Sequence, residues 1–565
     1  MKYMDGLKEN NFLKKSQLNR IHRALFDEQK TWIQEWKEIR EYINPYLGAF
    51  DEDRPNDGKR KDDSLINTVG IEASNTHGAG MQNGVTSPTR FWFRMTDPDP
   101  EIAQMEEVRY WYDDLTQAMH DALGRSNFYP ESHKFHKERG TFGTASMFVM
   151  EDEETDVRYR TFTIGEFAIG LDHTNRIRRF ARNIHMSVAA LIDMFGLENV
   201  PEVVQRCYEQ NRLEESFAVK HLIMPNQAAE NGKIDKWNKP FIDIYWMDQC
   251  NDGDYLLISG FDSFPVVCSR WETKGSDVYG FGPGHYALRN SKSVQVIDED
   301  IHIGVKKQVD PPVQLPAESM SAALNSLPNG VNYYARDMQE TPIRELYQVR
   351  LNLADANALK DSKEENIKRH FFVDLFRMLE NIDYGNVTRQ EIIERVQEKM
   401  SLIGPSFALL QPEYLKPVLD RTFDILYRRG QIPDPPEVIE GRGMKIEYVN
   451  IMAQAQKMSG ISAIYEYSDF AIKISSIDPA AMDKWDRDET LDRAGEVLGV
   501  PPSLIVDDKR VEKIRADRAQ RQQMAEAAQM AQMAVQGANT LGNTPVGQGS
   551  ALDALIPGLG GGAGQ

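Results

Sequence analysis

The stretch 343–384 reads IRELYQVRLNLADANALKDSKEENIKRHFFVDLFRMLENIDY and contains neither glycine nor proline. Apolar side chains recur in its second half at steps of three and four residues, as in a helix: Ile367, Phe371, Leu375, Met378 and Ile382. Thr341 fits an N-cap, with Pro342 at the first helical position. A helix over 343–383 would be about 60 Å long at about 1.5 Å per residue, longer than a globular core requires. The sequence therefore predicts a single rod-like helix that extends beyond an ordinary globular core.

Two segments before this rod differ from it in pattern. Residues 279–285, Tyr-Gly-Phe-Gly-Pro-Gly-His, form a glycine-rich turn. The apolar residues between Val294 and Val305 fit both the alternation of a strand and the steps of a helix, so the local pattern leaves the two open. Residues 311–342 contain five prolines and predict a compact irregular module.

The first 278 residues combine helical and strand patterns. Apolar residues from Ser16 to Ile43 recur on one helical face, and four further segments predict helices: 64–82, 101–123, 187–195 and 201–211. Short runs of β-branched and aromatic residues predict strands: 145–150, 157–164, 177–182, 241–247, 255–259 and 264–268. The predicted fold class is α+β, mainly helical.

The last third returns to helical patterns. Helices are predicted over 388–400 and 413–429, and the glycine- and proline-free segment 510–536, rich in Ala, Gln and Met, predicts another. Residues 537–565 are glycine-rich and nearly uncharged, which predicts a flexible tail.

Composition limits the classes of function. The 565 residues carry 66 Lys and Arg against 86 Asp and Glu, a net charge of −20, which argues against wrapping nucleic acid with the whole surface. Three cysteines, no signal sequence and no long apolar run predict a soluble protein of a reducing, intracellular compartment without a membrane partner.

A search for catalytic motifs finds none. The sequence has no phosphate-binding P-loop, no G-x-S-x-G elbow and no H-E-x-x-H pair, so we predict no catalytic residue, no cofactor and no metal. His133 and His136 would share a helical face and hold a metal, or they belong to a solvated turn packed by Phe135. The arginines between Arg176 and Arg182 form either a nucleic-acid patch or a strand edge with ion pairs.

Three acidic runs leave open the alternative that the protein is an enzyme. Asp51–Asp53, Glu151–Glu154 and Asp298–Asp300 are either exposed loops or carboxylates for Mg²⁺-assisted nuclease chemistry. A virion scaffold or ejection protein with a coiled coil is a third function class. Against it, Leu346 and Leu353 are followed by Lys360 in the same heptad register.

The segment Asn83-Gly-Val-Thr-Ser-Pro-Thr-Arg-Phe-Trp-Phe93 combines a helix stop, a Ser-Pro turn and an aromatic triplet, with Phe91 and Phe93 expected to be buried. It resembles the motif "G-[LV]-T-S-P-x-R-x-W-F" of portal proteins, the head-to-tail connectors of short-tailed double-stranded-DNA bacteriophages. The matching positions are Gly84, Thr86, Ser87, Pro88, Arg90, Trp92 and Phe93. Residues 279–288, 310–331 and 386–399 resemble further stretches of that family in the same order.

The resemblance implies a portal fold, a dodecameric ring with wing, stem, clip and crown around a central channel. The implied divisions are 1–278 wing, 279–310 first stem segment, 311–342 clip, 343–383 second stem helix, 384–490 tunnel loop and return to the wing, 491–536 crown and 537–565 tail. The implied channel loop is Asp383, Tyr384, Gly385, Asn386, Val387 and Thr388. The implied clip contacts are Pro311, Pro312, Leu315, Leu327 and Pro328.

The resemblance also implies a function and partners. The ring would sit at one capsid vertex of the virion, assembled in the host bacterial cytoplasm, as the conduit for DNA packaging and ejection. Implied partners are the major capsid protein, the scaffolding protein, the terminase large subunit and tail adaptor or nozzle proteins. A docked motor would supply ATP hydrolysis, so no active site is expected, and the acidic charge would let double-stranded DNA slide.

Overall fold

A computed structural model describes residues 14–50, 61–63, 65–227, 238–251, 254–309, 313–314, 344–345, 352–380, 402–449, 467–475, 484–498, 506 and 508–542. The chain divides into two compact units, Met1–Tyr465 and Glu466–Gln565. None of the helices in these described stretches has the length and apolarity of a membrane-spanning segment.

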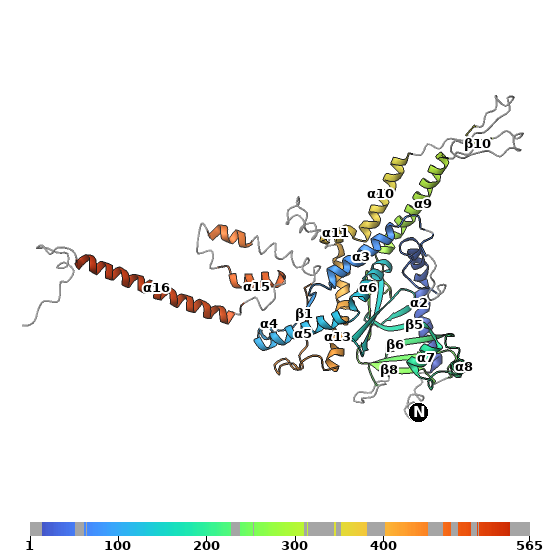
Figure 1. Ribbon diagram of the computed structural model, residues 1–565, viewed down its shortest axis with the longest axis horizontal. Coiled ribbons are helices and arrows are strands. Elements are labelled where there is room, and N and C mark those ends of the chain that lie inside the picture. The colour runs from blue at the N-terminus through green and yellow to red at the C-terminus, as the bar shows by residue number, and fades with distance from the viewer. Residues whose placement is uncertain are drawn as a thin grey trace, which may run out of the picture. The chain divides into compact units, whose positions relative to one another are not determined.

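Helices form one part of the first unit (Figure 1). They are α2 (Lys15–Tyr42), α3 (Val69–Val85), α4 (Pro100–Ala103), α5 (Glu106–Arg125) and α6 (Phe128–Phe142). The helix predicted over 101–123 is interrupted between α4 and α5. Asp99 caps the start of α4 by accepting from the Glu101 N–H. The short α4 ends at Ala103, and the longer α5 has its own acidic first turn, which favours a helix start.

Two antiparallel sheets form the other part. The first has the order β3-β2-β9 and the second the order β4-β5-β6-β7-β8. Their strands are β2 (Thr144–Asp152), β3 (Asp156–Phe162), β4 (Phe167–Leu171), β5 (Ile177–Ser187), β6 (Ser216–Pro225), β7 (Phe241–Trp246), β8 (Leu257–Phe261) and β9 (Val266–Arg270). The structure therefore confirms the α+β class and the strands predicted in this region.

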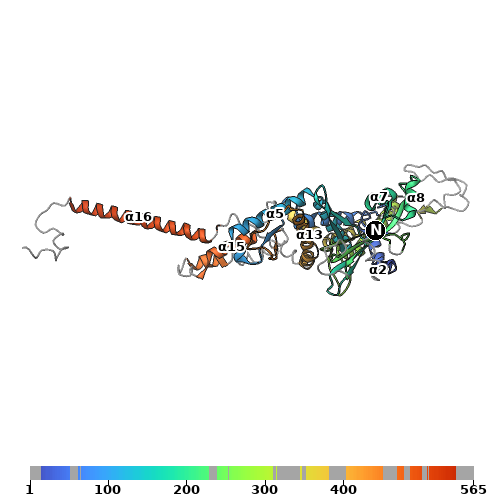
Figure 2. The same ribbon diagram turned by 90° about the horizontal axis from the view of Figure 1, so that it is seen from below.

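A small helical pair packs at one end of the five-stranded sheet (Figure 2). It comprises α7 (Val188–Phe195) and α8 (Glu202–Glu209), which confirms the two helices predicted there. The Ser187 hydroxyl caps α7 by accepting from the Ala190 N–H at 3.3 Å. Val188, Leu191 and Val204 are fully buried in the apolar cluster beneath the pair.

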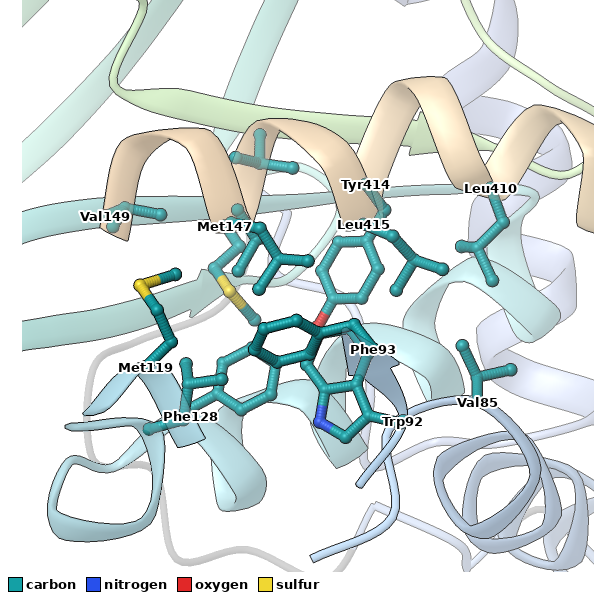
Figure 3. Close-up of a cluster of buried hydrophobic side chains, with 14 of the residues drawn as sticks. Val85, Trp92, Phe93, Met119, Phe128, Met147, Val149, Leu410, Tyr414 and Leu415 are labelled. Atoms are coloured by element: carbon teal, nitrogen blue, oxygen red, sulfur yellow. The ribbon is translucent and has the colours of Figure 1, made fainter. Parts of the chain in front are cut away.

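The largest core joins both ends of this unit. Residues 402–410 are helical, followed by the π-helical turn η4 (Gln411–Leu415) and α13 (Lys416–Arg428). Leu410, Tyr414 and Leu415 from this late segment pack on Trp92 and Phe93 from the early one (Figure 3). The same connection is made by β1 (Phe93–Thr96), which pairs with β12 (Lys445–Tyr448).

The described residues of the second unit are mainly helical. Residues 467–475 form a helix, and α15 (Arg487–Leu498) and α16 (Asp508–Gly542) follow. Arg515 on α16 donates two hydrogen bonds to the Asp488 carboxylate, at 2.6 and 2.7 Å. This unit begins at Glu466, before the boundary predicted at 491. The tail predicted from 537 is wrong at its start, because α16 continues through Gly537 to Gly542; a single glycine only weakens a helix.

Glu138 of α6 is a carboxyl buried in the first unit. Its oxygens accept from the Thr163 hydroxyl at 2.5 Å and from the Ile164 N–H at 3.3 Å. Burial raises the pKa of Glu138 to about 7, although both hydrogen bonds lower it.

This burial predicts a pH-dependent loss of stability. The unfolded carboxyl releases its proton near pH 4.5, while the folded one keeps it until about pH 7, so stability falls as pH rises through that window. The loss is on the order of 3 kcal/mol at most. A Glu138→Gln variant should lack this fall when urea midpoints are compared at pH 5 and pH 8, whereas the exposed Glu41→Gln should follow the wild type. Parallel curves for Glu138→Gln and wild type would contradict the assignment.

Candidate functional site: a helical hairpin and its seat

Two antiparallel helices extend from the rest of the first unit as a hairpin (Figure 1). We call α9 (Pro283–Val309) and α10 (Leu353–His370) the hairpin. Beyond its end, β10 (Val313–Gln314) pairs antiparallel with β11 (Arg344–Glu345).

The structure resolves the ambiguity of the segment after the glycine-rich turn in favour of a helix. The buried residues of α9 include Leu288, Ser291, Val294 and Asp298, spaced at three and four. The alternation in the sequence came from apolar residues that lie on the outside, such as Val296 and Ile303, which are 57% and 42% exposed. Within the range 279–310 predicted as the first stem segment, the structure describes the turn and α9, which ends at Val309.

The glycine-rich turn seats the start of α9 on the end of α6. A Cβ on Gly284 would lie 2.0 Å from the Thr141 carbonyl oxygen, and a Cβ on Gly282 would lie 2.8 Å from the Gly143 Cα. Both obstacles are backbone atoms, so neither moves without moving α6. His285 is neutral here because burial lowers its pKa to about 4, and its Nδ1 accepts from the Gly282 N–H at 3.1 Å. The turn has glycines because the two backbones touch.

A polar clamp holds both hairpin helices to the loop before α3. The Asn67 amide donates to Asp298 of α9 and to Glu364 of α10, both at 2.8 Å. Gln295 accepts from the backbone N–H groups of Ile66 and Asn67 at 2.8 and 2.9 Å. One asparagine therefore connects the loop to both helices.

Removing the Asn67 amide should loosen this clamp. Asn67→Ala leaves Asp298, only 8% exposed, without one of its donors, which should lower stability by about 1 to 3 kcal/mol. Chemical denaturation measures this, and hydrogen exchange should show faster opening of α9 and α10. The matched control is Asn83→Ala, an exposed asparagine on α3, for which we expect a change below about 0.5 kcal/mol. Equal stabilities for the two variants would contradict the clamp.

The predicted continuous helix over 343–383 is wrong. Arg344–Glu345 are in strand β11, α10 begins at Leu353, and after His370 the chain turns into a separate helix, α11 (Val373–Glu380). Phe372, at the break, has a φ of 58°, in the left-handed region. The helix therefore ends without a glycine or a proline.

Contacts from α3 explain this break. The Phe371 carbonyl accepts a hydrogen bond from His77 Nδ1 at 3.0 Å, and burial lowers the pKa of His77 to about 4. Phe376 of α11 lies directly on Gly80, where a Cβ would come within 2.1 Å of the ring. Phe371 and Phe376 are both almost fully buried. The turn between the helices redirects α11 into the core, and burial of the two rings favours it over a straight helix.

The segment 83–93 joins the end of α3 to the large core. The Thr86 hydroxyl is fully buried and lies 2.8 Å from the Ser132 hydroxyl and 3.3 Å from His136 Nε2. Trp92 and Phe93 are also fully buried, with their ring centroids 4.5 Å apart (Figure 3). Of the predicted motif residues, the structure buries Gly84, Thr86, Ser87, Trp92 and Phe93, and it exposes Pro88 and Arg90.

Phe91 was expected to be buried but is 54% exposed. Its ring stacks on His120 at 4.4 Å, and Phe93 stacks on the same imidazole at 4.1 Å. Desolvation lowers the pKa of His120 to about 4, so the neutral ring serves as an aromatic layer between them. Phe91 covers one wall of a surface groove of about 510 Å³ that Arg90 and Arg125 also line.

Comparison with known proteins assigns the family. The family described as bacteriophage head to tail connecting protein matches residues 15–506. The chain belongs to this family. It is 33% identical over 533 residues to the portal protein of Salmonella phage epsilon15, covering 94% of this chain and 96% of the relative. It is 31% identical over 488 residues to the probable portal protein of Bordetella phage BPP-1, covering 86% and 88%. Its role is therefore that of a connector between phage head and tail, as the resemblance implied.

Two of the three acidic runs considered for nuclease chemistry contain a carboxylate that pairs with another side chain. Asp298 accepts from Asn67 and lies 3.3 Å from the Lys360 ammonium, and Glu151 pairs with Arg428. Asp51–Asp53 lie outside the described residues. Within the part of the chain that the structure describes, no three His, Cys, Asp or Glu side chains come together as a metal site.

The structure also shows the surroundings of the histidine pair and of the arginine cluster. His136 is buried rather than solvated, because α6 turns this face to the core, where it contacts the Tyr414 ring at 5.4 Å. Arg178 pairs with Asp172 at 3.3 Å, and Arg182 donates to His221 at 2.9 Å, so these arginines belong to a strand with polar partners.

The implied channel loop, Asp383–Thr388, and the implied clip contacts between Pro311 and Pro328 lie outside the described residues, as does the helix predicted over 388–400. Their roles stay predictions.

Sequence reasoning missed the residues that position the hairpin. Asn67 and Gln295 are single polar residues without a motif. Arg139 is fully buried and donates to the Ser269 hydroxyl and to the carbonyls of Arg270 and Ser406, which ties α6 to β9 and to the helix 402–410. Only the glycine-rich turn gave a signal, since repeated glycines indicate close backbone approach.

Proposed function

We propose that copies of this chain form a closed dodecameric ring at one capsid vertex, with the hairpin and the segment beyond it surrounding a central channel. The observation that carries this is the hairpin itself. Two helices extend together from the rest of the first unit, and α9 keeps apolar side chains such as Val296 and Ile303 on its outside. In a ring, neighbouring hairpins cover such residues.

In this proposal the divisions of the chain serve different tasks. Residues 1–278, together with the return segment within 384–490, form the wing that meets the major capsid and scaffolding proteins. Residues 311–342, the clip with Pro311, Pro312, Leu315, Leu327 and Pro328, dock the terminase large subunit and later the tail adaptor or nozzle proteins. The loop Asp383–Thr388 contacts the channel, and 491–536 form the crown. Assembly takes place in the host bacterial cytoplasm.

The net negative charge of the chain supports its proposed role as a conduit for DNA. Each chain carries a net charge of −20, so a ring of twelve copies would be strongly acidic as a whole. Double-stranded DNA is a polyanion that cationic walls would retain, so an acidic ring lets it slide during packaging and ejection. The proposed work of the chain is passage and docking, with ATP hydrolysis supplied by the docked motor.

Native mass spectrometry of the purified full-length chain tests the ring. We expect a species with about twelve times the 64.5 kDa of one chain. A cyclic ring also requires that each copy present two different, complementary surfaces. Only monomers and dimers at every ionic strength and protein concentration would overturn the proposal.

A further inference from the structure

An apolar groove of about 730 Å³ lies where β5, β9, η4 and α13 meet. Its lining includes apolar and aromatic side chains of β5, β7, η4 and α13 and of the residues just before β9 and η4: Ile177, Phe241, Pro412, Pro417, Phe264 and Leu409. The phenyl rings of Phe241 and Phe264 lie 5.3 Å apart. The groove therefore offers an aromatic-lined surface of the kind that binds extended, proline-rich segments.

Cations line the edge of this groove. Arg178 is paired with Asp172 at 3.3 Å and Lys416 with Asp420 at 2.9 Å. Arg176 is exposed, and the described residues provide its guanidinium with no carboxylate partner. Deeper in, Arg270 and Glu413 neutralise each other at 2.6 Å. The unpaired charge of the groove is thus positive and lies at its mouth.

Elsewhere in the same unit, an exposed loop carries negative charge. Residues 432–440 read Ile-Pro-Asp-Pro-Pro-Glu-Val-Ile-Glu, and we call them the acidic proline loop. Ile432 and Ile439 anchor it, at 6% and 4% exposure, and the Trp111 indole N–H donates to the Pro433 carbonyl at 3.1 Å. The loop is therefore fixed at both ends.

Between these anchors the loop presents acids and an apolar side chain. Asp434, Glu437 and Glu440 are exposed, and nowhere in the described ranges does a cation pair with them. Val438 is 48% exposed. A proline-rich segment held in one conformation loses little entropy on binding, so its contacts convert efficiently into affinity.

We propose that the acidic proline loop of one copy docks in the basic-edged groove of the next copy, with Glu437 near Arg176. The inference rests on the proposed ring and names its interface. Copies that each carry −20 repel one another, so a stable contact requires local opposite charges. A groove and a loop on one chain are different surfaces, and this is the heterologous arrangement that closes into a cycle.

Cysteine crosslinking of the full-length chain tests this pairing. A variant with both Arg176→Cys and Glu437→Cys should form, on mild oxidation, a ladder of covalent oligomers on a denaturing gel. The single variants should form none, because all three native cysteines are buried. The matched control carries Arg23→Cys with Glu437→Cys; Arg23 is an exposed arginine on α2, and no ladder is expected. Absence of a ladder from the first pair, or an equal ladder from the control, overturns the proposal.

Charge reversal distinguishes this interface from the ring itself. Arg176→Glu and Glu437→Arg should each reduce the ring fraction in native mass spectrometry by at least tenfold at low salt, and the combined variant should restore it. Rings unaffected by either single change, or not restored by the combination, contradict the interface and leave the ring intact as a proposal. A wild-type chain that never forms rings contradicts the proposed function instead.

Discussion

Replacing Gly284 with alanine is expected to unseat α9 and to lower the stability of the first unit by about 3 kcal/mol or more. The new Cβ would lie 2.0 Å from the Thr141 carbonyl oxygen and 2.9 Å from its carbon. These are backbone atoms at the end of α6, and α6 is packed against β2 and β3. Relief therefore requires α9 to move away from its seat, which also strains the clamp at Asn67.

Urea denaturation and hydrogen exchange of α9 measure this effect. The matched control is Gly124→Ala, a helical glycine of α5 whose Cβ would meet nothing within 4 Å. This control should be neutral or more stable by about 0.5 to 1 kcal/mol, because alanine is the better helix former. If Gly284→Ala unfolds at the same urea concentration as Gly124→Ala, the seat has been assigned to the wrong residues.

Phe376→Ala should be the second large effect, a loss of about 3 to 5 kcal/mol. The ring is 1% exposed, lies on Gly80 and contacts the His77 imidazole edge-on at 5.5 Å. Its removal leaves a void between α3 and α11, next to the turn after α10 that burial of this ring stabilises. Urea denaturation measures the loss, with the exposed Phe470→Ala in the second unit as the control.

A double-mutant cycle sharpens this test. Gly80→Ala alone should destabilise the chain, because its Cβ would lie 2.1 and 2.3 Å from two ring carbons of Phe376. In the Phe376→Ala background those carbons are gone and only the Cβ, at 2.6 Å, remains, so Gly80→Ala should be less destabilising there. Additive effects of the two substitutions would show that the ring does not lie on Gly80.

The sequence predicted those helices and strands that have a regular apolar pattern or a capping residue at their start. Helix α2 has apolar residues at helical spacing, and α7 begins at the capping hydroxyl of Ser187. Six of the eight strands of the two sheets were predicted from β-branched and aromatic runs between turns, while β4 and β6 were missed. In these segments local preference and tertiary packing favour the same structure.

The break after α10 could not be read from the sequence. Residues 343–384 contain no glycine or proline, and Phe372 is an unusual residue for a φ of 58°. The turn after α10 depends on contacts with His77 and Gly80, which lie almost three hundred residues earlier in the chain. No sequence motif connects these two residues with the turn. The strand β11 was missed for a similar reason, since a two-residue ladder exists only through its partner β10.

The sequence predicted where the hairpin begins, but it did not predict the contacts that hold the hairpin in place. The family motif located the buried Trp92 and Phe93, and the glycine-rich turn marked the start of the hairpin. The clamp was not foreseen, because Asn67, Asp298 and Glu364 come together only when the loop and both helices are in place.

Electron cryomicroscopy of the purified full-length chain tests the central claim most directly. The account predicts closed rings of twelve copies in which α9 and α10 of every copy line a central opening. Particles without an opening, or rings in which the hairpins point outward and away from the axis, would contradict it.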